Sequence, residues 1–105
     1  MVDAQVQAEI ASIPVLVYSK TWCPYCDRAK RALTALGIDH KVYELDKMSD
    51  GEVIQSALER ITGQSTVPNI FVGGTHVGGC DDMMGMISNG SLRDLLVSKG
   101  IPFSE

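Results

Sequence analysis

The spacing of apolar positions changes several times along this chain, and each spacing predicts a different element. Residues 14–19 begin with an unbroken apolar run, which is typical of a strand buried on both faces. From residue 24 the apolar positions recur with helical spacing up to Leu36, and Gly37 provides the expected stop. Residues 40–45 alternate between polar and apolar, as in a strand with one solvated face. This order predicts two parallel strands joined by a right-handed crossover.

Helical spacing and helix-start residues predict four further helices. These are residues 4–11, a helix running from a capping-box pattern at 49–52 to Gly63, a helix from Asp81 and Asp82 to Gly90, and a last helix from Ser91, as its cap, to Gly100.

A third strand is predicted at residues 67–72, where apolar residues follow Pro68. Gly73 and Gly74 fit a two-residue hairpin turn, after which residues 75–77 return antiparallel. The predicted order is therefore αβαβαββαα, an α/β chain with helices flanking a four-stranded mixed sheet. This is a thioredoxin-like arrangement.

Composition narrows the classes of protein that the chain can belong to. With 105 residues, of which 45% are hydrophobic, residues 1–105 are expected to form a single domain. The net charge of -4 argues against nucleic acid or an anionic membrane as partner. Three cysteines do not suggest a secreted disulfide framework, and residues 1–12 lack the features of a signal peptide. We expect a cytoplasmic monomer, or a plastid or other organellar one if a targeting peptide precedes this sequence.

The candidate chemistry lies where the first strand passes into the next helix. Cys23 and Cys26 have C-x-x-C spacing, and Pro24 occupies the expected first helical position. Cys23 would then lie beside the unpaired N–H groups of a helix start, with Lys20 as a nearby cation. Both effects favour a thiolate, the reactive form of cysteine, and Cys26 is one turn away. The pattern predicts a redox-active dithiol.

Other uses of these cysteines must be weighed. A C-x-x-C pair can be half of a zinc site, but the remaining ligand candidates are scattered: Cys80, His40 and His76. A purely structural disulfide is also disfavoured, because so small a ring restricts little of the unfolded chain.

Three segments together resemble a dithiol glutaredoxin of the plant and algal type. They are Cys23-Pro24-Tyr25-Cys26, then Thr66-Val67-Pro68, and finally Gly78-Gly79-Cys80-Asp81-Asp82. The resemblance implies a glutathione-dependent thiol–disulfide oxidoreductase without a metal. Cys23 would attack glutathionylated proteins, and a second glutathione would resolve the intermediate. Cys26 would serve a dithiol route that reduces protein disulfides. Glutathione reductase would then be an indirect partner, through glutathione.

The resemblance also implies a glutathione site. Its residues would be Lys20, Tyr25, Gln64, Thr66, Val67, Pro68, Gly79, Cys80, Asp81 and Asp82. A cis peptide before Pro68 would leave the backbone of Val67 free to pair with the ligand. Asp82 would take the γ-glutamyl ammonium, while Lys20 and Gln64 would hold the glycine carboxylate.

Two questions stay open at this point. Some glutaredoxins hold a [2Fe–2S] cluster between two protomers, although a proline directly after the first cysteine, here Pro24, argues against that alternative. Cys80 is either a buried, inert thiol or a secondary site of glutathionylation or disulfide formation.

Overall fold

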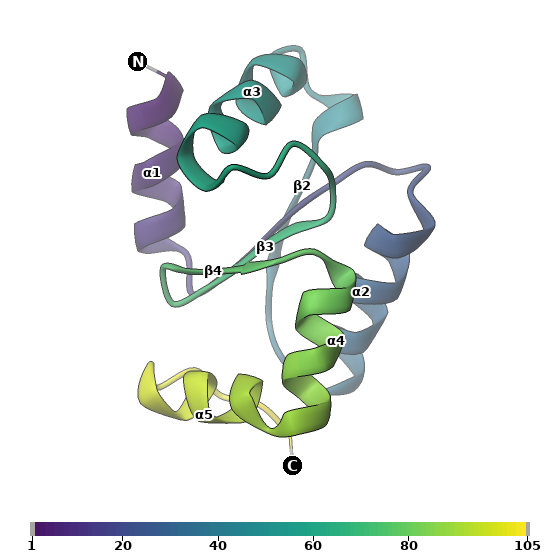
Figure 1. The fold of residues 1–105 in the computed structure, drawn as a ribbon, viewed down its shortest axis with the longest axis vertical. Helices are drawn as coiled ribbons and strands as arrows, with labels where there is room; N and C mark the ends of the chain where they lie inside the picture. Colours follow the sequence, from purple (N-terminus) through teal and green to yellow (C-terminus); the bar gives the residue numbers. More distant parts are fainter. Residues whose placement is uncertain (1, 105) are drawn as a thin grey trace.

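The computed structural model describes residues 2–104 and has the predicted order of helices and strands (Figure 1). The elements are α1 (Val2–Ser12), β1 (Val15–Ser19), α2 (Pro24–Ala35), β2 (Lys41–Glu44), the 3₁₀ helix η1 (Leu45–Lys47), α3 (Gly51–Thr62), β3 (Asn69–Val72), β4 (Thr75–Gly78), α4 (Cys80–Asn89) and α5 (Ser91–Ser98).

The four strands form one mixed sheet in the order β2-β1-β3-β4. Strand β1 pairs parallel with β2 and antiparallel with β3, and β3 pairs antiparallel with β4 through the predicted Gly73-Gly74 turn. The mixed sheet and the α/β class predicted from the apolar pattern are thus confirmed.

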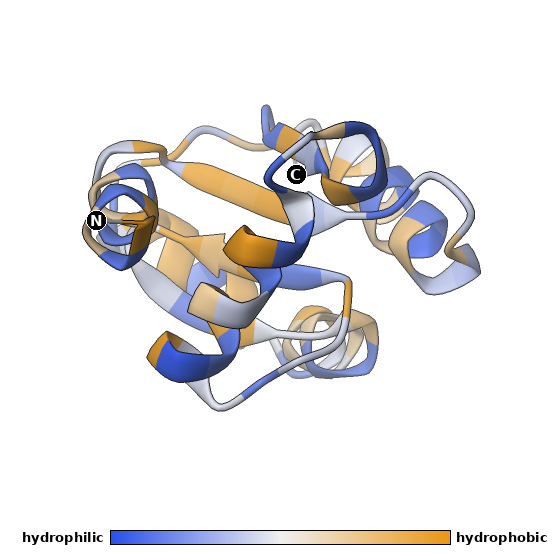
Figure 2. Ribbon diagram, turned by 90° about the horizontal axis from the view of Figure 1, so that it is seen from above, coloured by the Kyte–Doolittle hydropathy of each residue, from blue (hydrophilic) through white to orange (hydrophobic). Residues whose placement is uncertain are grey.

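Strand β1 separates two hydrophobic cores because its successive side chains point to opposite faces of the sheet. Val15 and Val17 face the core that contains residues of α2, α4 and α5. Leu16 and Tyr18 face the second core, formed with α1 and α3. The two central strands, β1 and β3, are therefore largely apolar, whereas the helices carry both hydrophobic and hydrophilic residues (Figure 2). The unbroken apolar run reflects burial on both faces.

Two predicted helix starts are wrong in detail. The capping box at residues 49–52 does not form: Asp50 is the residue before α3, and its side chain makes no capping hydrogen bond. Residues 48–50 connect η1 to α3, and Gly51 is required at the start of α3 because a Cβ atom would overlap the carbonyl oxygen of Leu45. This steric demand between two neighbouring elements overrides the local capping signal.

Ser91 is the first residue of α5 and not its cap. Gly90 precedes it with a φ of +83°, a conformation that favours glycine. The N–H of Ser91 donates to the side-chain oxygen of Asn89 at 2.9 Å, so the capping acceptor comes from two residues upstream.

Candidate active site

Cys23 lies at the junction between β1 and α2, and both neighbouring elements fix its position. Its N–H donates to the carbonyl of Lys20 at 3.1 Å, and Pro24 is the first residue of α2, as predicted. The N–H of Cys26 donates to the Cys23 sulfur at 3.2 Å. This bond places a backbone donor of the first turn of α2 against the Cys23 sulfur.

Cys26 lies one turn further along α2 and is fully buried, whereas Cys23 keeps 5% of its surface exposed. Burial, followed by its hydrogen bond with Cys23, raises the pKa of Cys26 to about 11. Cys26 is therefore protonated at neutral pH. Both cysteines are free thiols in this structure.

A carboxylate from a different element anchors the loop before Cys23. One oxygen of Asp46, in η1, accepts from the N–H of Thr21 at 3.0 Å, and its second oxygen accepts from the Thr21 hydroxyl. The bond from the Thr21 hydroxyl and the bond from the Thr21 N–H both lower the pKa of Asp46. Asp46, which follows β2, therefore holds the loop segment that leads to Cys23, and we call this pair of bonds the Asp46 clamp.

A groove of about 350 Å³ lies next to Cys23, between two walls formed by distant segments. The residues lining it are Tyr25, Thr66, Val67, Pro68, Gly79, Cys80, Asp81 and Asp82. The first wall carries the Val67–Pro68 peptide, which is cis, as the resemblance implied. The Cys23 sulfur lies 3.8 Å from the carbonyl oxygen of Val67, so this thiol faces the first wall.

The second wall is the start of α4. Helix α4 begins at Cys80, and a side-chain oxygen of Asp82 accepts from the N–H of Gly79 at 3.0 Å. Gly78 has a φ of +110°, and a Cβ atom there would overlap the Asp82 carboxylate. Gly79, by contrast, has a φ of -90° that any residue can adopt. The glycine that this wall requires is therefore Gly78, which the predicted site did not include.

Two predicted site residues do not line the groove. Lys20 lines a separate hollow of about 440 Å³, and its ammonium lies 5.7 Å from the ring centre of the exposed Trp22. The side-chain amide of Gln64 donates to the carbonyls of Thr66 and Pro68 at 3.1 and 3.0 Å. The structure therefore brings together all the predicted glutathione residues except Lys20 and Gln64.

Cys80 lines the groove but keeps only 3% of its surface exposed. Burial raises the pKa of this thiol above its ordinary value. Its surroundings favour the hypothesis of a buried, inert cysteine over that of a second reactive thiol.

Three residues near the site were missed from the sequence: Asp46, Gly78 and Gln55. Gln55 lines the same hollow as Lys20 and donates to the carbonyl of Ser65 at 2.7 Å. For Gly78 a signal existed, because two adjacent glycines after a strand are typical of a position that needs positive φ. Asp46 offered none, since its partner Thr21 is 25 residues away.

The comparisons with known proteins agree with this geometry. The sequence profile of the glutaredoxin family matches residues 15–77. Glutaredoxin-C1 of Arabidopsis thaliana is 54% identical over 91 residues, which cover 87% of this chain and 73% of that protein. Glutaredoxin-C6 of Oryza sativa subsp. japonica is 48% identical over 100 residues, covering 95% and 89%. The crystal structure of a buckwheat glutaredoxin–glutathione complex superposes with a TM-score of 0.91 at 45% identity, covering 95% of this chain and 91% of that one. Within residues 2–104, no helix is long and apolar enough to cross a membrane.

Proposed function

Because this chain belongs to the glutaredoxin family and is a glutathione-dependent thiol–disulfide oxidoreductase, we propose that Cys23 is its nucleophile. The observation that carries this proposal is the hydrogen bond from the N–H of Cys26 to the Cys23 sulfur at the start of α2. Cys23 also keeps a small exposed surface, whereas Cys26 is fully buried.

The proposed reaction consists of two thiol–disulfide exchanges. In the first, the Cys23 thiolate attacks the glutathione sulfur of a protein–glutathione mixed disulfide. The old S–S bond breaks, a Cys23–glutathione disulfide forms, and the protein leaves as a thiolate that takes a proton from water. In the second, the thiolate of another glutathione attacks the glutathione sulfur on Cys23. Oxidised glutathione leaves, and the Cys23 thiolate is restored.

The groove provides the groups that would hold glutathione during both steps. We assign the backbone of Val67, beside the cis peptide, to the cysteinyl part of the ligand, which would pair with it as an added strand. The start of α4 offers N–H groups and the Asp82 carboxylate to the γ-glutamyl end, with its opposite charges. Lys20 would supply a positive charge for the glycine carboxylate from the neighbouring hollow. Gln64 supports the loop of the first wall through its two bonds to carbonyls.

For protein disulfides we propose a slower dithiol route through Cys26. In this route Cys26 attacks the disulfide formed on Cys23, and the substrate leaves as a thiol. Since the pKa of Cys26 is about 11, deprotonation of Cys26 must accompany its attack. This requirement favours the glutathione route at neutral pH.

We propose glutathionylated and disulfide-containing proteins as substrates, and a monomer of one domain as the active form. We also propose the cytoplasm as its location, with a plastid or another organelle as the alternative. Zinc and iron–sulfur functions are not favoured over the oxidoreductase. The family match supports the latter, and Pro24 as the first residue of α2 stiffens the loop after Cys23.

The test is glutathione-coupled turnover of a glutathionylated substrate by the wild type and single cysteine variants. Cys23→Ser should lose at least about 1,000-fold in turnover, because serine cannot replace the thiolate. Cys26→Ser should stay within about three-fold of the wild type, since the glutathione route does not use Cys26. Cys80→Ser serves as the matched control and should behave like the wild type. Turnover by Cys23→Ser at near wild-type rate would overturn the assignment.

A further inference from the structure

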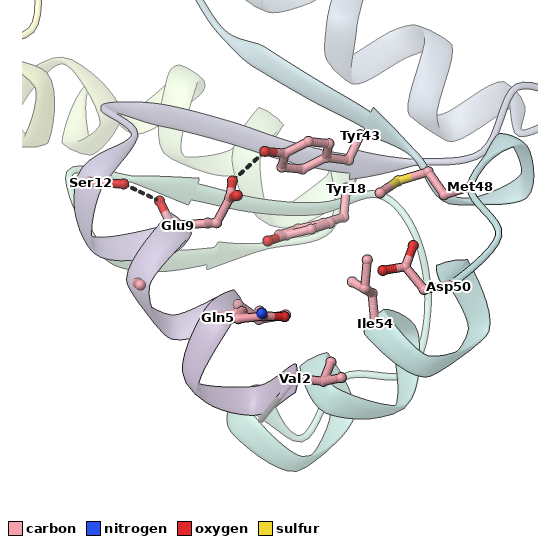
Figure 3. Close-up of a pocket in the computed structure, with 11 residues that line it drawn as sticks. Val2, Gln5, Glu9, Ser12, Tyr18, Tyr43, Met48, Asp50 and Ile54 are labelled. Atoms are coloured by element: carbon pink, nitrogen blue, oxygen red, sulfur yellow. Dashed lines mark hydrogen bonds between the residues drawn. The ribbon is translucent and has the colours of Figure 1, made fainter.

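A second hollow, of about 740 Å³, lies between α1, β2 and the start of α3 (Figure 3). It is on the face of the sheet that α1 and α3 cover, and it shares no lining residue with the groove beside Cys23. Its volume lies within the range of small-molecule sites. The proposed function does not account for it.

One buried polar group opens into this hollow without a partner. The side chain of Tyr18 is only 1% exposed, and its ring packs against Tyr43 and Phe71 with centroid distances of 5.6 and 6.1 Å. Its hydroxyl points toward α1 (Figure 3) and makes no hydrogen bond to any residue within 2–104. Within residues 2–104 this oxygen is not among the fully buried side-chain atoms that lack a partner, so it is open to the hollow, where it can donate and accept a hydrogen bond.

The charged residues that line the hollow within 2–104 are acidic. Glu9 and Asp50 line it, and the lining residues within 2–104 include no lysine, arginine or histidine. The hydroxyl of Tyr43 donates to the Glu9 carboxylate, and this bond raises the pKa of Tyr43 to about 12. Tyr43 thus stays neutral at physiological pH and acts as a hydrogen-bond donor at the wall.

The aromatic part of the wall already accepts a cation. The ammonium of Lys41 lies 5.4 Å from the ring centre of Tyr43, within cation–π distance. The rest of the lining is mostly apolar, with Val2, Val6, Ala8, Met48 and Ile54, and includes the polar Gln5 and Ser12. A ligand that fits this wall combines an apolar body with a positively charged, hydrogen-bond-donating group.

We propose that this hollow binds a small organic cation, such as an amidinium or primary ammonium on an aromatic or aliphatic body. The charged group would lie between the Glu9 carboxylate and the Tyr18 hydroxyl, and the body would pack against Val6 and Ile54. Carboxylates at the wall repel anions. This site would therefore act separately from the groove that takes glutathione.

The test compares three ligands of one shape and different charge, benzamidine, benzamide and benzoate, by nuclear magnetic resonance titration of the ¹⁵N-labelled protein. Benzamidine should shift the amide signals of α1 and of the start of α3 with a Kd in the millimolar range, as expected for so small a ligand. Benzamide should bind at least about ten-fold more weakly, and benzoate should cause no shift in these elements. Equal binding of benzamide and benzamidine, or shifts confined to other elements, would overturn the proposal.

Two variants assign the contacts, and a third controls for charge. Tyr18→Phe and Glu9→Gln should each weaken benzamidine binding about five-fold to ten-fold, because each removes one polar partner. Glu59→Gln removes an exposed carboxylate of α3 that does not line the hollow, and should bind benzamidine like the wild type. Glutathione-coupled turnover should be unchanged in all three. Wild-type affinity for benzamidine in Tyr18→Phe, or a loss of affinity in Glu59→Gln equal to that in Glu9→Gln, would contradict the site. If a variant misfolds, the comparison of the three ligands with the wild type still decides the proposal.

Discussion

In the groove beside Cys23 many of the polar groups available to a ligand are backbone atoms, whereas in the hollow beside Tyr18 the polar groups we identify are side-chain atoms. The groove presents the carbonyl of Val67 and the N–H groups at the start of α4. The hollow presents the phenol of Tyr18 and the carboxylates of Glu9 and Asp50. Strand β1 contributes Tyr18 to the hollow, and the loop that follows β1 carries Cys23 to the groove.

This difference predicts how each region responds to substitution. A wall of backbone groups depends on local conformation and should tolerate many side-chain changes that leave φ and ψ unchanged. A wall of side chains should keep its shape while losing its ligand after a single conservative change. The groove is therefore best perturbed by replacing one of its glycines. The hollow is best perturbed by a substitution that removes one side-chain oxygen.

The largest effect is expected at Gly78. Gly78→Ala should lower the free energy of unfolding by about 2–3 kcal/mol, because alanine is strained at a φ of +110° and its Cβ would overlap the Asp82 carboxylate. Gly74→Ala is the matched control: Gly74 also has positive φ, +83°, but a Cβ there would meet no atom within 4 Å. It should cost about 1 kcal/mol. Urea unfolding measures both values, and equal losses would show that Asp82 does not constrain this wall.

The buried thiol below the groove should make stability depend on alkaline pH. The pKa of Cys26 is raised from 9.0 to about 11 on folding, so the folded protein retains a proton that the unfolded chain releases. The resulting stabilisation is complete below pH 9 and is lost as the pH rises through 11. The wild type should therefore lose about 2 kcal/mol more than Cys26→Ser over this window. Urea unfolding at a series of pH values measures this difference. An equal loss of stability in the two proteins between pH 9 and 11 would contradict the burial of Cys26.

A smaller loss is expected when the clamp on the nucleophile loop is removed. Asp46→Ala should lower kcat/KM for a glutathionylated substrate about ten-fold, because Thr21 loses both bonds that hold it two residues before Cys23. Thr21→Val removes only the hydroxyl bond and should lie between Asp46→Ala and the wild type. Steady-state kinetics would measure these ratios. Unchanged kcat/KM in Asp46→Ala would show that the loop is held without this carboxylate.

The smallest effects should distinguish the two tyrosines of the hollow. Tyr43→Phe should cost about 1 kcal/mol of stability, because it removes the hydrogen bond to Glu9. Tyr18→Phe should stay within about 0.5 kcal/mol of the wild type, since its hydroxyl bonds to no residue within 2–104. Thermal unfolding of the pair gives this comparison directly. A loss in Tyr18→Phe as large as that in Tyr43→Phe would mean that the Tyr18 hydroxyl is bonded in solution.

The sequence predicted the features that depend on local chemistry. The apolar run of β1, the glycine turn between β3 and β4, and the helix start at Pro24 each rest on residues next to one another in the chain. The groove was largely predicted as well, through the resemblance of three short segments to one family.

Features set by contacts between distant elements could not be predicted. The overlap that keeps Gly51 a glycine involves a carbonyl of η1, a helix with no hydrophobic periodicity of its own. The clamp of Asp46 on Thr21 crosses from one strand end to another. The hollow beside Tyr18 depends on how α1 packs against the sheet, and its tyrosine appeared in the sequence only as part of an apolar run. Local patterns carry no information about such juxtapositions.

The position of β2 has a further consequence for local opening. In the order β2-β1-β3-β4, β2 is an edge strand, bonded to a neighbour on one side only. Edge elements exchange their amide protons through small opening motions that leave the rest of a protein intact. Asp46 follows β2 almost immediately, so each such opening also frees the N–H of Thr21. Thr21 should therefore exchange at the rate of β2 and not at that of the preceding strand β1, so the loop that leads to Cys23 opens together with β2.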